Sequence, residues 1–192
     1  MVTASGGSRR ALLTAAGAAL AAAGGGALAG CGRKAKPGRQ SVKLVAPAIR
    51  QADVEILDQM LALERQTVAA YTAGIPLLQK PQAKAAKQFL SQELQHTGEL
   101  LSLIKAAEGK ASPRAASYDL GHPRGAADVL ALLHDLERAQ IGAYLEALPR
   151  LAPGPVRAAV ATILASDAQH ISILRVLQGS APVPAAFVTG SE

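Results

Sequence analysis

The sequence predicts an all-α protein built as one four-helix domain. Aromatic residues make up only 3% of the 192 residues, and Ala and Leu are abundant. No run alternates Val, Ile or Thr with polar residues as a half-buried strand does. Apolar residues instead recur with the 3.6-residue period of a helix in four long segments. The length suits one domain of ordinary size rather than two.

Residues 1–30 have the features of an export signal and stand outside the fold. Arg9 and Arg10 precede an uncharged stretch, rich in Ala and Gly, that ends in Leu28-Ala29-Gly30-Cys31. This order resembles a twin-arginine signal peptide followed by a lipoprotein cleavage box, after which Cys31 carries the lipid. The alternative is an uncleaved membrane helix, since the apolar run is close to the length that spans a bilayer. Cleavage predicts an exported protein that is lipid-anchored on the extracytoplasmic face of the cell membrane.

Residues 31–51 form a basic tether. Eight of the 20 Lys and Arg residues precede residue 51, where there is no Asp or Glu, so the remaining chain has 12 basic against 14 acidic residues. The folded part is therefore slightly acidic, which argues against a nucleic-acid partner. Beside a lipid anchor the cations of the tether attract anionic headgroups, and a plain soluble spacer is the alternative.

The first two helices are predicted over residues 52–78 and from Pro81 to about Gly109. Pro76 disturbs the end of the first helix, whereas Pro81 suits the first turn of the second, where its missing N–H costs nothing. Gly109 then stops the second helix. The positions on their core-facing stripes are Leu57, Leu61, Glu64, Val68, Tyr71 and Ile75, then Phe89, Glu93, His96, Leu100 and Leu103.

The second pair of helices is predicted over residues 126–148 and 155–177, which closes a bundle domain of residues 52–178 and leaves 179–192 as a tail. The stretch before the third helix can extend to about 50 Å at roughly 3.3 Å per residue, so it can cross a bundle whose helices are about 38 Å long. The positions on these two core-facing stripes are Leu130, Leu133, Glu137, Ile141, Tyr144 and Leu148, then Val160, Ile163, Asp167, His170, Ile171 and Leu174.

A carboxylate interrupts every one of these apolar stripes, and no Lys or Arg lies on them. A buried carboxylate costs on the order of several kcal/mol unless it is compensated, and metal cations would compensate four that converge. The interruption is part of a repeat: Leu-Glu-Arg, a tyrosine two helical turns after the glutamate, then carboxylate-x-x-His. The copies are Glu64, Tyr71, Glu93 and His96, then, about 73 residues further on, Glu137, Tyr144, Asp167 and His170.

The duplication distinguishes this pattern from chance. A single carboxylate-x-x-His is weak evidence, because a surface pair produces it too. Here each half supplies one glutamate from one helix and a carboxylate-x-x-His pair from the next, and the two side chains of that pair lie one turn apart on one face. This is the arrangement of carboxylate-bridged di-iron and di-manganese bundles.

On these motifs, residues 52–178 resemble the ferritin-like superfamily of the rubrerythrin and bacterioferritin type, and the whole chain resembles its exported bacterial lipoprotein members. The resemblance implies a four-helix bundle with a long crossover between helices 2 and 3. It also implies a cofactor of two iron ions, with manganese or zinc as alternatives. The implied roles are terminal ligands at Glu64 and Glu137, bridges at Glu93 and Asp167, one histidine per ion at His96 and His170, and hydrogen bonds to ligand carboxylates across the bundle from Tyr71 and Tyr144.

Several residues depart from that pattern or stand beside it. Asp167 replaces the usual glutamate and is one methylene shorter, so we expect one-sided bridging and a weaker second ion. No Cys-x-x-Cys pair exists, which excludes a rubredoxin electron-donor module. We interpret Met60 as core filler rather than a haem ligand, His134 as a satisfied core histidine or one that supports a ligand, and His122 as a loop residue.

The sequence favours a membrane-tethered dinuclear protein that handles oxygen or peroxide as an oxidase or peroxidase under oxidative or iron stress. The alternative is a non-enzymatic module that binds or stores metal, or binds a partner, at the cell envelope. A closed storage cage is disfavoured because a lipid on every subunit would obstruct the shell, whereas a homodimer is compatible with the anchor.

Overall fold

The computed structural model describes residues 49–191, and this part of the chain contains helices and no strand. The predicted signal peptide, Cys31 and most of the tether lie outside the described residues. The prediction of an all-α four-helix bundle is confirmed. The elements are α1 (Gln51–Gly74), the short 3-10 helix η1 (Ile75–Leu77), α2 (Lys80–Ala106), α3 (Ala126–Ala147) and α4 (Pro155–Leu177).

The first helix is shorter than its apolar period suggests. The α-helical hydrogen bonding ends at Gly74, and Pro76 lies in the 3-10 turn that follows. A side chain at Gly74 would place its Cβ 2.6 Å from Cγ1 of Val129, so the end of α1 approaches α3 as closely as glycine allows. The second helix begins as expected, with Pro81 in its first turn.

A buried carboxylate fixes the start of α1. Asp53 accepts hydrogen bonds from the backbone N–H and the guanidinium of Arg50, at 2.9 and 2.8 Å. It also accepts one from the backbone N–H of Ala152, 3.1 Å away in the α3–α4 connection. One side chain therefore caps a helix and joins it to a segment that follows 99 residues later.

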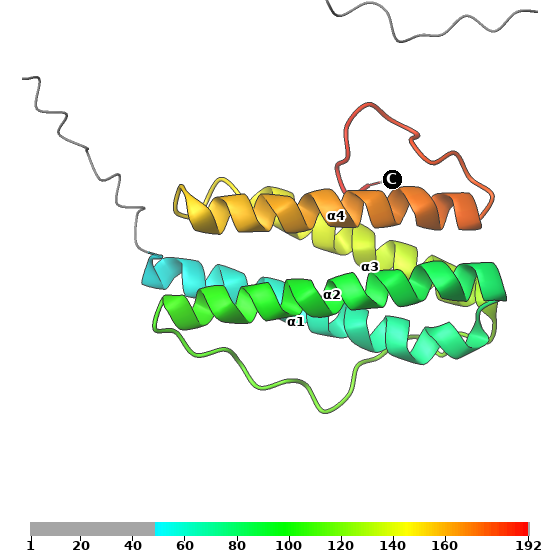
Figure 1. Cartoon of the computed structure of the whole chain (residues 1–192), viewed down its shortest axis with the longest axis horizontal. Coiled ribbons are helices and arrows are strands. Elements are labelled where there is room, and N and C mark those ends of the chain that lie inside the picture. Colours follow the sequence, from blue (N-terminus) through cyan, green and yellow to red (C-terminus); the bar gives the residue numbers. More distant parts are fainter. Residues whose placement is uncertain (1–48, 192) are drawn as a thin grey trace, which may run out of the picture. The chain divides into compact units, whose positions relative to one another are not determined.

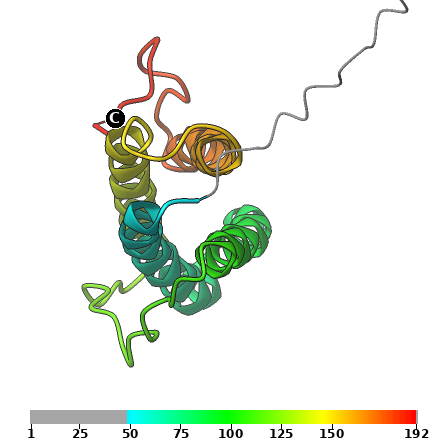
Figure 2. The same ribbon diagram turned by 90° about the vertical axis from the view of Figure 1, so that its left-hand side faces the viewer.

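The chain runs along α1, back along α2, crosses over, and returns through α3 and α4. Helices α2 and α3 therefore point the same way, and the connection between them runs the length of the bundle (Figure 1). Ser112 of this crossover donates its backbone N–H to Asp58 of α1, and its carbonyl accepts a hydrogen bond from Arg65. Seen end-on, α2 lies beside α1 and α4 beside α3 (Figure 2).

The interior is a polar layer between two apolar clusters. One cluster includes Leu57, Met60 and Leu100, and the other includes Phe89 and Leu133. Met60 is thus core filler, as predicted. Between them lie buried polar side chains from all four helices: Glu64, Thr67, Glu93, Glu137, Gln140, Asp167 and His170. Among the described helices α4 is long and apolar enough to cross a membrane by length and composition alone, yet its inner face belongs to this core.

Candidate metal centre

All six residues of the predicted ligand set come together at the middle of the bundle. Each of the four helices carries one of these carboxylates on its core-facing stripe, and the four positions lie at the same level along the bundle. The four carboxylates are fully buried, at 0% exposure, and His170 is 1% exposed. The side chain of His96 is the most accessible of the six, at 11%. The set is Glu64 on α1, Glu93 and His96 on α2, Glu137 on α3, and Asp167 and His170 on α4.

The six residues fall into two overlapping groups. One comprises Glu93, Glu137, Asp167 and His170, and the other Glu64, His96 and Asp167; within each group the ligand atoms lie within 4.8 Å of one another. Asp167 belongs to both. Oε1 of Glu93 lies 3.1 Å from Nδ1 of His170 and 3.6 Å from Nδ1 of His96. Asp167 and Glu93 therefore lie where the two groups meet.

Several potential ligand atoms of this cluster form no hydrogen bond within the part of the chain that the structure describes. Six buried atoms form no hydrogen bond with any described residue: Glu64 Oε2, Glu93 Oε1, Glu137 Oε2, Oδ1 and Oδ2 of Asp167, and Nδ1 of His96. An unpaired buried polar group costs about 1–3 kcal/mol, and a charged one costs more. Carboxylate oxygen and imidazole nitrogen are ligands that iron, manganese and zinc accept. The cluster is therefore compatible with metal binding, and a cation would satisfy the atoms that the protein leaves unpaired.

Burial is the largest influence on every carboxyl group of the cluster. It raises the pKa of Glu64 to about 8. Burial and the neighbouring carboxylates also raise the pKa values of Asp167 and Glu137 above their ordinary range. At Glu93, burial acts in the same direction, but the imidazoles of His170 and His96 outweigh it and hold the pKa of that carboxyl well below its ordinary range.

The two imidazoles respond in the opposite sense. Burial lowers the pKa of His96 and of His170, but the adjacent carboxylates outweigh it and raise both pKa values to about 9. Without a metal, the cluster therefore carries protons on its histidines and on some of its carboxyl groups at neutral pH. A cation that binds here must displace those protons.

The comparison with known families agrees with this geometry. The sequence pattern of the ferritin-like domain matches residues 52–180. The chain belongs to the ferritin-like domain family. A search of curated proteins gave no match.

Solved structures share the fold of this ferritin-like domain. A conserved hypothetical protein from Mycobacterium tuberculosis is 24% identical with a TM-score of 0.63, over 71% of this chain and 96% of that chain. A protein from Bacillus anthracis str. Ames, described as a ferritin-like diiron-carboxylate protein, is 17% identical with a TM-score of 0.56, over 65% of this chain and 94% of that chain. At these identities the likeness concerns the fold.

Two tyrosines of the ferritin-like domain connect its halves. The hydroxyl of Tyr71 on α1 donates to Oε1 of Glu137 on α3 at 2.7 Å. The hydroxyl of Tyr144 on α3 donates to Oε1 of Glu64 on α1. Each tyrosine thus holds the glutamate of the other half. Burial raises both tyrosine pKa values well above the ordinary one, so the hydroxyls remain donors.

Three further polar residues support the cluster and were missed from the sequence. Thr67 donates to Oε1 of Gln140 at 2.8 Å, and Nε2 of Gln140 donates to Oε2 of Glu93 at 3.4 Å. Oε1 of Gln92 lies 2.8 Å from Nε2 of His170. A signal for the first two was available, because Thr67 and Gln140 each follow their repeat glutamate by three residues on the buried face. Such contacts orient ligands in metal sites.

The remaining histidines stay outside both groups. His134 is buried in α3, and burial lowers its pKa. Its Nε2 has no hydrogen-bond partner among residues 49–191, so the expectation of a satisfied histidine is wrong even though its place in the core is as expected. Its Nδ1 lies 3.8 Å from Oδ1 of Asp135. His122 is exposed in the crossover, as predicted for a loop residue.

Proposed function

We propose that this ferritin-like domain binds two metal ions at the six-residue cluster and, with iron, reacts with oxygen or peroxide as an oxidase or peroxidase. The observation that carries the proposal is the set of buried carboxylate and imidazole atoms that form no hydrogen bond with residues 49–191. Manganese and zinc satisfy the same donors, but of the three metals iron most readily supplies electrons to an oxidant.

The ligand roles follow from the two overlapping groups. Glu137 and His170 would hold one ion, and Glu64 and His96 the other. Asp167, which belongs to both groups, and Glu93, which lies beside both histidines, would be shared by the two ions. When bound, a ferrous pair supplies two electrons to a small oxidant.

The protein's own residues supply protons and exclude water. The hydroxyls of Tyr71 and Tyr144 hold a proton at Oε1 of Glu137 and Glu64, which fixes these carboxylates and leaves their Oε2 atoms free. In the metal-free protein the carboxyl of Glu64, with its pKa of about 8, holds a proton near neutral pH, and a bound cation would displace it. The apolar clusters on both sides keep the layer from bulk water, which strengthens its electrostatic contacts.

The location is proposed from the sequence. The export signal with Arg9 and Arg10, the cleavage box and the lipid on Cys31 would tether the protein to the extracytoplasmic face of the membrane. Its basic tether would then lie against anionic headgroups. The oxidant would be met at the cell envelope.

The test is metal stoichiometry together with oxidant consumption. The chelator-stripped protein is supplied anaerobically with ferrous iron, its metal content is measured, and oxygen or peroxide is then added. We expect two ions per chain and consumption of the oxidant. A variant with Glu93→Gln and Glu137→Gln should lose both properties, whereas Glu55→Gln, on the exposed face of α1, should keep them. Two bound ions without oxidant consumption would favour a storage or binding module, and the absence of bound metal would refute the site.

A further inference from the structure

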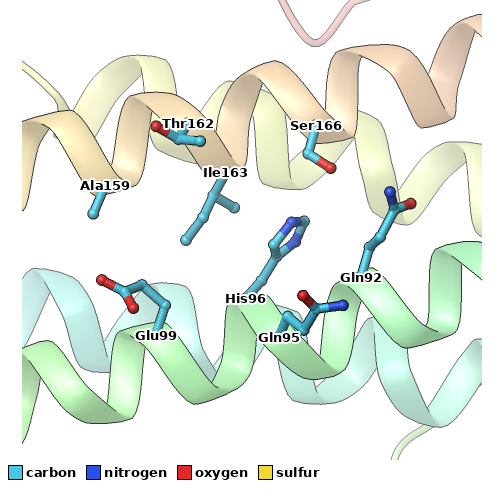
Figure 3. Close-up of a pocket in the computed structure, with 8 residues that line it drawn as sticks. All are labelled: Gln92, Gln95, His96, Glu99, Ala159, Thr162, Ile163 and Ser166. Carbon is cyan, nitrogen blue, oxygen red and sulfur yellow. The ribbon is translucent and has the colours of Figure 1, made fainter.

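A pocket of about 510 Å³ lies between α2 and α4 and reaches the metal cluster. His96 forms part of its wall, and its ring projects between the two helices toward Ile163 and Ser166 (Figure 3). Nδ1 of the same ring lies 3.5 Å from Oδ1 of Asp167. One imidazole therefore has the cluster on one side and the pocket on the other.

In the second half-site, which carries the same sequence motif, neighbouring side chains cover the histidine. His170 is covered by Phe89, whose ring stacks on the imidazole with a centroid separation of 4.2 Å. Gln92 covers its Nε2 from 2.8 Å. With these two neighbours in place the side chain of His170 is 2% exposed.

Smaller side chains occupy the equivalent positions around His96. The carboxylate-x-x-His segments are offset by 74 residues, so Ile163 corresponds to Phe89 and Ser166 to Gln92. Both are shorter and both line the pocket. Within residues 49–191 no side chain hydrogen-bonds to Nε2 of His96, and this side chain is 11% exposed. The pocket exists because the repeat is asymmetric at these two positions.

The charge on the pocket wall favours cations over anions as ligands of the pocket. Glu99, one helical turn beyond His96, is the only acidic residue among those that line the pocket, and apart from the imidazole of His96 the other lining side chains are uncharged. Glu99 is exposed to solvent at the mouth of the pocket. Its repeat counterpart is Ile173, so only the open half carries a carboxylate at its mouth. A single negative charge attracts a hydrated divalent cation and repels anions.

We propose that this pocket is the route by which divalent cations reach the cluster, and that they arrive at the His96 half because Ile163 and Ser166 leave it open. Glu99 captures the ion at the mouth. The half-site of His170 is then filled from within, through Asp167, which belongs to both groups. The inference rests on the proposed metal binding and adds the order in which the two half-sites are filled.

The test measures the rate of cobalt(II) uptake by the metal-free protein, followed by visible absorbance after rapid mixing. Ser166→Gln places at the open half the side chain that covers the closed half. We expect it to slow association by about tenfold or more while the number of ions bound at equilibrium is unchanged, because closing a route affects the rate first. Ser102→Gln, the same change at an exposed position of α2, should bind at the wild-type rate.

Two further variants keep the test decisive. Ile163→Phe fills the other small position and should slow uptake in the same way, so the proposal does not depend on one variant folding. Glu99→Gln should slow uptake by about two- to threefold at low ionic strength, and the difference should disappear as salt screens the charge. A thermal melt of each variant checks that the bundle is intact.

The outcomes separate the route from the metal site. Slower uptake in Ser166→Gln and Ile163→Phe with two ions at equilibrium supports the route. Wild-type rates in both folded variants overturn it while leaving the metal site in place. If the wild-type protein binds no cobalt at equilibrium, the proposed function and the route fall together.

Discussion

Replacing Glu64 with Gln should stabilise the metal-free protein at neutral pH. Burial raises the pKa of Glu64 to about 8 in the folded state, so folding holds a proton that the unfolded chain releases. A carboxyl whose pKa is raised by folding makes its full contribution to the free energy of unfolding at pH values below its pKa in the unfolded chain. This contribution decreases as the pH rises above that pKa, and it becomes constant once the pH exceeds the pKa in the folded state. Gln has no proton to lose, and its Oε1 can still accept the hydrogen bond from Tyr144.

The size of the effect follows from the pKa. The ordinary value for this group is 4.5. Each pH unit above it is worth about 1.4 kcal/mol until the folded pKa is reached, so the wild type loses about 3 kcal/mol by pH 7. This is a substantial fraction of the stability of a domain, which is about 5–15 kcal/mol.

Urea unfolding in the presence of a chelator measures the difference. The stability of Glu64→Gln relative to wild type should increase by about 2.5 kcal/mol between pH 5 and pH 7. Glu55→Gln, which removes an exposed carboxylate from the same helix, should show no such change. Added metal should reverse the order, since it stabilises the protein that binds it more tightly. Parallel pH profiles for wild type and Glu64→Gln would refute the account of a strained, metal-free cluster.

The other predictions concern neighbouring contacts and the anchor. Tyr71→Phe should leave the fold intact at a cost of about 1–2 kcal/mol but shift the optical spectrum of bound cobalt, because Glu137 loses its hydrogen bond; identical spectra would make the tyrosine ordinary packing. Asp167→Ala should bind fewer than two ions by metal analysis, and Asp167→Glu should bring two unequal titration steps closer together. Asp53→Asn should destabilise the protein by about 1–2 kcal/mol at pH 7. Although burial raises its pKa, the hydrogen bonds from Arg50 lower it below the ordinary value, so this contribution is present above about pH 4 and disappears in acid urea titrations below it. Cys31→Ala should release the protein from the membrane fraction, and retention of an intact precursor would instead indicate a spanning helix.

The sequence predicted the helices because their ends carry local signals. Pro81, Gly109 and Pro155 mark boundaries to within a few residues, since each acts on its own turn. The six clustered residues were also within reach, because a carboxylate on an apolar stripe must face the core. The contact of Gln92 with His170 was not, because it depends on how far α2 and α4 are rotated and shifted against each other. One helix's period does not determine that.

The position of the cluster explains how the bundle can be stable although its centre contains unpaired buried polar atoms. The apolar clusters on either side of the polar layer contain the largest fully buried aliphatic side chains, such as Leu57, Leu100 and Leu133. Their burial stabilises the fold whether or not a cation is present, at about 25 cal/mol per Å² of apolar surface. The polar layer can therefore keep unpaired oxygens that an isolated site could not hold in place. Because both flanks are fixed, loading an ion changes protonation and local geometry at the centre, and we expect the helices themselves to remain where they are.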